Sequence, residues 1–284
     1  MAESNFSLQK TLTMLLDEKK YHSLRDILST MNPADIAAIF DDLDQACLPL
    51  LFRLLPKELA AETFVEMEPE AQELLIRGFS DSELKEVIDE LYVDDAVDIV
   101  EEMPANVVQR ILTQAEPDMR KQINEILRYP EDSAGSIMTT EYVSLRPNMT
   151  VEEAILRIRR TGIDKETIYT CYVTRGHKLI GLTSVKDLLL CEDDDATIES
   201  IMQEHVITVG TLDDKEQVAQ MFSKYNFLAL PVVDTEDRLV GIVTFDDAMD
   251  VMEDEATEDM EKMAAMLPSE HPYMRSTPIE IWKN

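Results

Sequence analysis

A period of twelve residues runs through the first half of the chain and limits what that half can fold into. Counting in steps of twelve from Met31 meets an apolar residue each time: Leu43, Leu55, Met67, Phe79, Leu91, Met103, Ala115 and Leu127. The columns three and four positions earlier, which begin at Leu28 and Ile27, are also almost entirely apolar. Apolar residues at i, i+1 and i+4 form one face of a helix. Each unit therefore predicts a helix of about eight or nine residues followed by a turn.

Helix-start signals follow the apolar positions in most of these units. They are proline or capping residues, at Asn32-Pro33, Pro56, Glu68-Pro69, Ser80-Asp81, Pro104 and Glu116-Pro117. A helix this short cannot bury its apolar stripe alone, so neighbouring units must stack on one another. The repeat therefore predicts an all-α superhelical solenoid over residues 1–130, and it carries no information about chemistry.

The pattern changes at the segment YPEDSAGSIM, residues 129–138, where Pro130 ends the last helical unit. Beyond it, strands rich in Val, Ile and Thr alternate with helical patterns, and this order occurs twice. The tripeptide SIM stands at 136–138 and again at 200–202, and residues 181–187 align with 241–247 as glycine, apolar, any, Ser or Thr, two of any type, Asp. Two β-α-β-β-α units in tandem are therefore predicted.

Such a tandem resembles a pair of CBS domains over about residues 137–260, with the first domain at 131–198 and the second at 199–250. The resemblance implies that the Ser or Thr hydroxyl and the following helix N-terminus meet phosphate oxygens, while the Asp accepts hydrogen bonds from ribose. It implies an adenine-nucleotide site at Ser184, Lys186 and Asp187, with Tyr169 or Phe227 stacking on the base.

The second copy of the motif differs from the first in one charge. Thr244 and Asp247 form its half-site, but Asp246 stands where the first copy has Lys186, and a carboxylate there repels phosphate. We therefore expect nucleotide in at most one of the two half-sites.

The second unit runs into an acidic segment, DDAMDVMEDEATEDMEK, at residues 246–262. Its spacing predicts a helix with Met249, Met252, Ala256, Met260 and Met263 on one side, where we expect the methionines to pack. Between residues 239 and 261 there are nine acids and no Lys or Arg. Eight like-charge pairs at i,i+3 or i,i+4 cost this helix about 2–4 kcal/mol. Such a helix needs cations around it.

The whole chain has the same imbalance, with 26 Lys and Arg against 58 Asp and Glu and a net charge of −32. This argues against nucleic acid as a partner, since nucleic-acid binding depends on basic residues, and it favours the collection of divalent cations. We find no HExxH, no G-x-S-x-G, no EF-hand loop and no metal-ligand spacing among the His and Cys residues, so we expect no enzyme. No apolar run approaches the roughly 20 residues that a membrane helix needs.

A short-repeat solenoid, the segment YPEDSAGSIMT, two CBS units and a long acidic helix follow one another as in MgtE-type magnesium transporters. The resemblance implies a cytosolic regulatory region on the cytoplasmic side of the cell membrane, a homodimer through the CBS pair, and a membrane pore domain beyond STPIEIWKN. Residues 251–284 then form the acidic connecting, or plug, helix. We expect a longer protein of which this chain is the soluble part.

The same resemblance implies Mg²⁺ as the ligand, and also ATP or another adenine nucleotide. It points to seven carboxylates that bind Mg²⁺ and lock a closed state: Glu62, Asp94, Asp95, Asp247, Asp250, Glu255 and Glu258. Asn226 stands where an acid is expected before the aromatic Phe227, which weakens a bridging site there. Carboxylates alone discriminate little among divalent cations, so Mg²⁺ over Ca²⁺ or Mn²⁺ rests on the resemblance.

Two alternatives stay open from the sequence. One is an adenine-nucleotide-sensing CBS module whose solenoid recruits a partner. The other is a protein–protein scaffold, because short-helix solenoids also resemble the armadillo-like domains of the flagellar motor switch. The scaffold leaves the base-free acidic helix unexplained.

Overall fold

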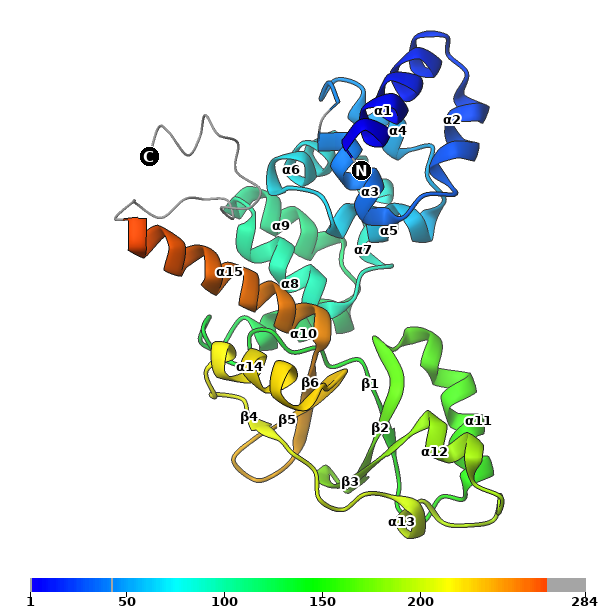
Figure 1. Cartoon of the computed structure of the whole chain (residues 1–284), viewed down its shortest axis with the longest axis vertical. Helices are drawn as coiled ribbons and strands as arrows, with labels where there is room; N and C mark the ends of the chain where they lie inside the picture. Colours follow the sequence, from blue (N-terminus) through cyan, green and yellow to red (C-terminus); the bar gives the residue numbers. More distant parts are fainter. Residues whose placement is uncertain (1, 42, 265–284) are drawn as a thin grey trace. The chain divides into compact units, whose positions relative to one another are not determined.

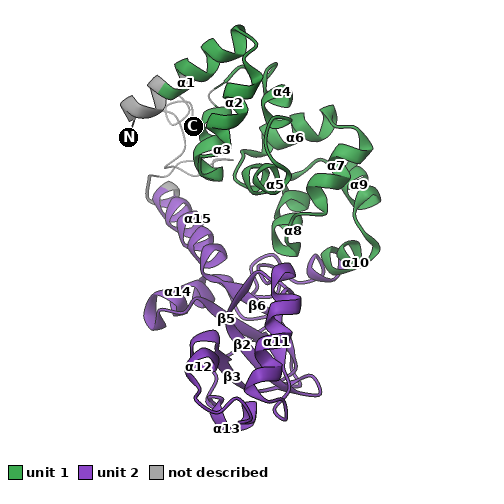
Figure 2. Ribbon diagram, turned by 90° about the vertical axis from the view of Figure 1, so that its right-hand side faces the viewer, with its two compact units in different colours: residues 1–123 green, residues 124–284 purple. Residues whose placement is uncertain are grey.

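The computed structural model describes residues 2–41 and 43–264. It divides into two compact units, Met1–Ile123 and Asn124–Asn284, which Figure 2 shows in different colours. The first unit is helical, and the second contains both sheets (Figure 1). The part of the expected connecting helix that follows residue 264 lies outside the described residues.

Ten helices occupy the described residues up to Ile126, and all of them are short except the first. Their bounds are α1 Ala2–Asp17, α2 Tyr21–Leu28, α3 Pro33–Asp41, α4 Leu48–Phe52, α5 Lys57–Val65, α6 Pro69–Gly78, α7 Asp81–Ile88, α8 Val93–Glu102, α9 Ala105–Gln114 and α10 Pro117–Ile126. Helices two apart in the chain contact each other, α3 with α5, α5 with α7 and α7 with α9, while α4 contacts α6. The solenoid predicted from the repeat is confirmed.

The repeated apolar column forms the core of this unit. The members from α2 to α8 are all at most 6% exposed: Leu28, Phe40, Phe52, Phe64, Ile76, Ile88 and Val100. The rings of Phe52 and Phe64 meet edge to face with centroids 6.1 Å apart, so successive repeats are joined through the same column. Burial of an apolar side chain at each step explains why the period is kept over so many units.

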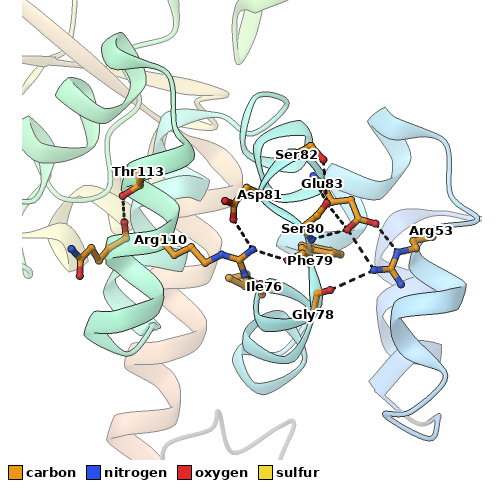
Figure 3. Close-up of polar contacts among 11 residues, drawn as sticks. Arg53, Ile76, Gly78, Phe79, Ser80, Asp81, Ser82, Glu83, Arg110 and Thr113 are labelled. Atoms are coloured by element: carbon orange, nitrogen blue, oxygen red, sulfur yellow. Dashed lines mark hydrogen bonds and ion pairs between the residues drawn. The ribbon is translucent and has the colours of Figure 1, made fainter.

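A capping box and two arginines fix the segments around the start of α7. Ser80 caps α7 by accepting from the Glu83 amide at 3.3 Å, and the Glu83 carboxylate accepts from the Ser80 amide at 2.7 Å. Arg53 of the loop after α4 donates through Nε to the same carboxylate at 2.7 Å (Figure 3). Arg110 of α9 donates to the carbonyl groups of Phe79, at 2.6 Å, and of Ile76. These arginines connect loops and helices that are about thirty residues apart in the chain.

The second unit holds two three-stranded sheets of the same topology. In the first sheet β1 (Tyr142–Leu145) pairs in parallel with β2 (Thr167–Arg175), which pairs antiparallel with β3 (Lys178–Ser184). In the second, β4 (Val209–Gly210) pairs in parallel with β5 (Ala229–Val233), which pairs antiparallel with β6 (Leu239–Thr244). The tandem CBS fold expected from the duplicated pattern is confirmed.

Helices connect and follow these strands in corresponding places. They are α11 (Val151–Thr161), a 3₁₀ turn (Gly162–Asp164), α12 (Val185–Leu190), α13 (Ile198–Ile201), α14 (Lys215–Tyr225) and α15 (Phe245–Ala264). α14 and α15 pack against each other and, through Phe222, Ala248 and Val251, join the core of the second CBS unit.

The two repeated sequence motifs meet across the CBS pair. A Cβ added to Gly181 would stand 2.7 Å from Met202 Sδ, and one added to Gly241 would stand 2.7 Å from Met138 Sδ. The SIM methionine of each copy thus packs against the motif glycine of the other copy. Isolated bridges between Leu182 and Gln203 and between Thr139 and Ile242 hold the same segments together. Only glycine allows this close approach.

Candidate functional site

In both Ser/Thr-x-x-Asp segments, each at the end of a sheet, the hydroxyl bonds to the Asp carboxylate, and the first segment forms a complete capping box. Ser184 Oγ accepts from the Asp187 amide at 3.0 Å and donates to Asp187 Oδ2 at 2.7 Å, which closes the first turn of α12. Thr244 Oγ1 donates to Asp247 Oδ2 at 2.5 Å at the start of α15. Part of the sequence signal taken for nucleotide recognition is therefore helix capping.

The nucleotide candidates of the first unit gather at one end of its sheet. Ser184 ends β3 and pairs with Thr170, the neighbour of Tyr169 on β2. The Tyr169 side chain is 66% exposed, and Lys186 and Asp187 are exposed on the first turn of α12. An exposed aromatic ring, a lysine, a hydroxyl and a carboxylate thus line one edge, which suits a nucleoside phosphate.

Phe227 lies in a different setting, because its ring is already packed. It stacks on Tyr225 with centroids 5.3 Å apart and meets Phe222 edge to face at 6.4 Å. The preceding Asn226 has φ of 54° and ends α14 in the left-handed conformation, which Asn tolerates better than most residues. This conformation gives a structural reason for Asn226 at a position where the resemblance led us to expect an acid.

Asp247 is the most strongly perturbed carboxylate of α15. It is half-buried, and burial raises its pKa to about 6, against the hydrogen bond from Thr244 and with a further contribution from the charges of Asp246 and Asp250. A carboxylate whose neighbours are acids and whose solvation is reduced gains from a cation close by.

The other α15 candidates face different surroundings. Glu255 is half-buried against α14, and burial together with the charges of Glu216 and Glu258 raises its pKa. Glu258 is exposed and forms an ion pair with Lys262, with Nζ and Oε1 2.7 Å apart. Asp250 is exposed on the surface of the helix. The family resemblance pointed to these four acids but not to Glu216, because its approach to Glu255 depends on how α14 packs on α15.

The candidates of the solenoid lie in the other compact unit. Glu62 is exposed on α5, while Asp94 is 5% exposed and Asp95 half-buried in the first turn of α8. The positive end of the helix dipole stabilises carboxylates in a first turn without any metal. This is a second reason, besides metal binding, for acids at these two positions.

The predicted methionine face of α15 does not pack within the described residues. Met249, Met252 and Met260 are 45%, 36% and 45% exposed, as is Phe245 at 47% on the same side. The packing face of the helix is formed instead by Ala248 and Val251. The expectation that the methionines are packing residues is wrong for this part of the chain.

Carboxylate oxygens are the donors that Mg²⁺ prefers, so the donor chemistry of α15 fits that ion. Within residues 2–41 and 43–264, no three His, Cys, Asp or Glu side chains converge on a preformed metal cage. Mg²⁺ keeps several of its waters and needs only one or two protein carboxylates, which is compatible with such an open arrangement. In the same residues no helix is long and apolar enough to cross a membrane.

The chain matches two family models that together cover most of it. Residues 31–132 match the MgtE intracellular N domain, and residues 134–192 and 198–254 match the CBS domain. The magnesium transporter MgtE of Thermus thermophilus is 38% identical to it over 280 residues, which are 97% of this chain and 62% of that transporter. The chain thus spans less than two thirds of the length of this relative.

Two solved structures are similar over nearly their whole length. The first is the cytosolic domain of the Mg²⁺ channel MgtE in complex with ATP, with a TM-score of 0.80, 38% identity and coverage of 86% of this chain and 99% of that one. The second is the soluble part of a magnesium transporter, with a TM-score of 0.80, 33% identity and coverage of 90% and 100%.

Proposed function

The chain belongs to the MgtE family of magnesium transporters and corresponds to their cytosolic region, and on that premise we propose that it is a Mg²⁺ sensor that regulates a transport pore. The observation that carries the proposal is the surroundings of Asp247. This side chain is half-buried among acids and has a raised pKa, so it is unfavourable in its charged form until a cation approaches.

The mechanism follows from charge repulsion that a divalent cation relieves. Asp247, Asp250, Glu255 and Glu258 place four carboxylates along α15, and Asp246 and Glu216 add to the negative field at two of them. Mg²⁺ bound to one conformation stabilises that conformation by mass action. High Mg²⁺ therefore locks a closed state, to which Glu62, Asp94 and Asp95 of the solenoid also contribute ligands, and low Mg²⁺ releases it.

The same proposal specifies partners and organisation. We take the chain to act at the cytoplasmic side of the cell membrane, as a homodimer through its CBS pair and joined to a membrane pore domain. The proposed division is a solenoid at 1–130, CBS domains at 131–198 and 199–250, and a connecting helix at 251–284. The role is regulatory rather than catalytic, in keeping with relatives that are transporter regions.

A thermal melt of the chain in EDTA and across a millimolar Mg²⁺ titration at constant ionic strength tests the sensor. We expect a saturable rise in melting temperature and protection of the segment 129–138 from limited proteolysis. Asp247→Ala combined with Asp250→Ala should remove most of the rise. Glu253→Ala combined with Asp259→Ala, two exposed acids of the same helix, should keep it. An equal loss in both double variants would mean that Mg²⁺ only screens the helix charge.

A second function, adenine-nucleotide sensing, is favoured by a specific observation. Tyr169, Lys186 and the Ser184–Asp187 box lie at one edge of the first sheet, and a similar solved structure is a complex with ATP. We propose one nucleotide site per chain in this first CBS unit. A rise in melting temperature with ATP but none with Mg²⁺ would reject the Mg²⁺ sensor and favour nucleotide sensing as the main function.

A further inference from the structure

The second unit contains a cavity that neither proposed function uses. It has a volume of about 660 Å³ and lies where β1 and β2 end and β3 begins. Tyr142, Pro147 and Leu239 form its apolar wall, and the hydroxyls of Ser144 and Thr174 stand 3.0 Å apart in it. The Tyr142 hydroxyl donates to the Leu239 carbonyl at 3.3 Å, which fixes the ring in the wall.

This cavity is separate from the proposed nucleotide site. Ser184 is the last residue of β3, whereas the cavity opens beside the turn that precedes Lys178, the first residue of that strand. Its lining includes none of the nucleotide candidates, which are Tyr169, Ser184, Lys186, Asp187 and Phe227. The volume is in the range of pockets that hold small organic ligands, about 300–1,000 Å³.

The lining is cationic in a strongly acidic protein. Four basic side chains contribute to it, which are Arg146, Arg157, Arg175 and His177. Between positions 146 and 178 the chain has seven Lys and Arg against four Asp and Glu, whereas the whole chain has 26 against 58. This stretch therefore has an excess of basic residues, opposite in sign to the chain as a whole.

Two of the arginines have no acidic partner to neutralise them. Arg175 donates to Glu199 at 2.6 Å, but Arg146 and Arg157 form no ion pair with any residue in the described ranges 2–41 and 43–264. Guanidinium groups bind phosphate through paired, charge-assisted hydrogen bonds. Two unpaired arginines at a polar cavity with an aromatic wall are therefore suited to bind a ligand that carries phosphate groups.

We propose that this cavity binds a small soluble polyanion with two or more phosphate groups, held by Arg146 and Arg157. Glu199 limits the affinity, because its carboxylate lies in the lining and occupies Arg175. The site could not be predicted from the sequence, since its four basic residues are spread over more than thirty positions without a motif. The inference does not depend on Mg²⁺ sensing and can fail or hold independently of it.

Calorimetric titration of the whole chain with inorganic tripolyphosphate, in EDTA and at fixed ionic strength, tests the proposal. We expect saturable binding of one ligand per chain. Arg146→Ala combined with Arg157→Ala should weaken it by about tenfold or more, while Glu199→Gln should strengthen it because Arg175 is released. Arg159→Ala is the matched control, since Arg159 is exposed on the same helix as Arg157 but does not line the cavity.

Several results would overturn the proposal. The first is the absence of saturable tripolyphosphate binding, and the second is an equal loss of affinity in Arg159→Ala. The third is a loss of affinity in Tyr169→Ala and Lys186→Ala but not in the cavity variants. Binding only to phosphatidylcholine vesicles that contain phosphatidylglycerol, with none to tripolyphosphate, would assign the surface to lipid and also reject it. Equal melting temperatures of the wild type and the double variant would establish that a lost affinity is not a lost fold.

Discussion

Thr244 Oγ1 and Asp247 Oδ2 are joined by a hydrogen bond of 2.5 Å at the point where β6 becomes α15. The bond holds a half-buried carboxylate beside Asp246 and Asp250, and the pKa of Asp247 is raised to about 6 as a consequence of burial and of these charges. The cap that starts the helix is therefore also the point where its negative charge is least well solvated.

Neutralising this one side chain should stabilise the chain when no metal is present. Asp247→Asn keeps an oxygen that accepts from Thr244 but removes the charge, so we expect the free energy of unfolding in EDTA to rise by about 1–2 kcal/mol. The same variant should respond less to Mg²⁺ than the wild type. Melting curves with and without Mg²⁺ measure both effects. Asp187→Asn, at the exposed box of the first unit, is the control and should show neither.

The close contact between Gly241 and Met138 gives a second prediction. A methyl group at position 241 would stand 2.7 Å from the Thr139 carbonyl oxygen as well as from Met138 Sδ, and the backbone group cannot easily move. We expect Gly241→Ala to lower the free energy of unfolding of the CBS unit by about 2 kcal/mol.

Gly78→Ala is the matched control for this substitution. Gly78 ends α6, and a Cβ there would meet nothing within 4 Å. The alanine should be neutral or stabilise the solenoid by about 0.5–1 kcal/mol, since it restricts the unfolded chain. Denaturant unfolding followed separately for each unit measures the pair. Equal effects at the two positions would show that the Met138 contact does not constrain the fold.

The solenoid column and the CBS glycine show what could and could not be predicted from the sequence. The twelve-residue column from Leu28 to Val100 predicted the solenoid and its core, because each member lies on the buried face of its own short helix. The glycine of the CBS motif was aligned correctly, but its partner methionine lies in the other copy, Met202 for Gly181 and Met138 for Gly241. Periodicity describes one element at a time and cannot supply such a partner.

The acidic helix shows the same limit. Its helical spacing was clear, yet Ala248 and Val251 pack while Met249, Met252 and Met260 stay exposed. The side that a helix buries depends on the element that covers it, here α14. The prediction from apolar character alone therefore selected the methionine side, which is exposed. Likewise, the partial burial of Asp247 depends on tertiary packing and cannot be predicted from the count of acids.

The Arg53–Glu83 contact of the solenoid gives a prediction about pH. The hydrogen bond from Arg53 and those from Ser80 lower the pKa of Glu83 from 4.5 to about 2. A carboxylate with a lowered pKa in the folded state adds stability above its unfolded pKa, and this stability is lost as the pH falls toward the folded value. Glu83→Gln should therefore destabilise the solenoid at pH 7, and its difference from the wild type should shrink between pH 4.5 and about 2.

The size of this effect should be modest because the side chains of Arg53 and Glu83 are 45% and 36% exposed. Solvent screening limits such a pair to about 1 kcal/mol or less. Chemical unfolding at a series of pH values measures it, with Glu86→Gln, an exposed acid on the same helix, as the control. A difference between Glu83→Gln and the wild type that stays constant down to pH 2 would contradict the assignment.

The exposed Tyr169 ring leads to a prediction about nucleotide affinity. Stacking of a base on an aromatic side chain contributes about 1–3 kcal/mol, so Tyr169→Ala should weaken ATP binding by about tenfold without loss of fold, because the side chain is 66% exposed. Lys186→Ala should weaken the binding of ATP more than that of adenosine, if the lysine contacts the phosphates as proposed. Lys224→Ala, an exposed lysine that lies over the Tyr225 ring, is the control.

The charge at position 246 gives a prediction about the number of nucleotides that bind. In the first unit Lys186 follows the capping serine by two positions, and in the second Asp246 follows Thr244 by two and adds its charge to that of Asp247. Phosphate is therefore attracted to one half-site and repelled from the other, and calorimetry should give one ATP per chain. Asp246→Lys should raise the stoichiometry toward two, because Thr244 and the start of α15 remain in place. A wild-type chain that already takes two ATP molecules would mean that this local charge does not control occupancy.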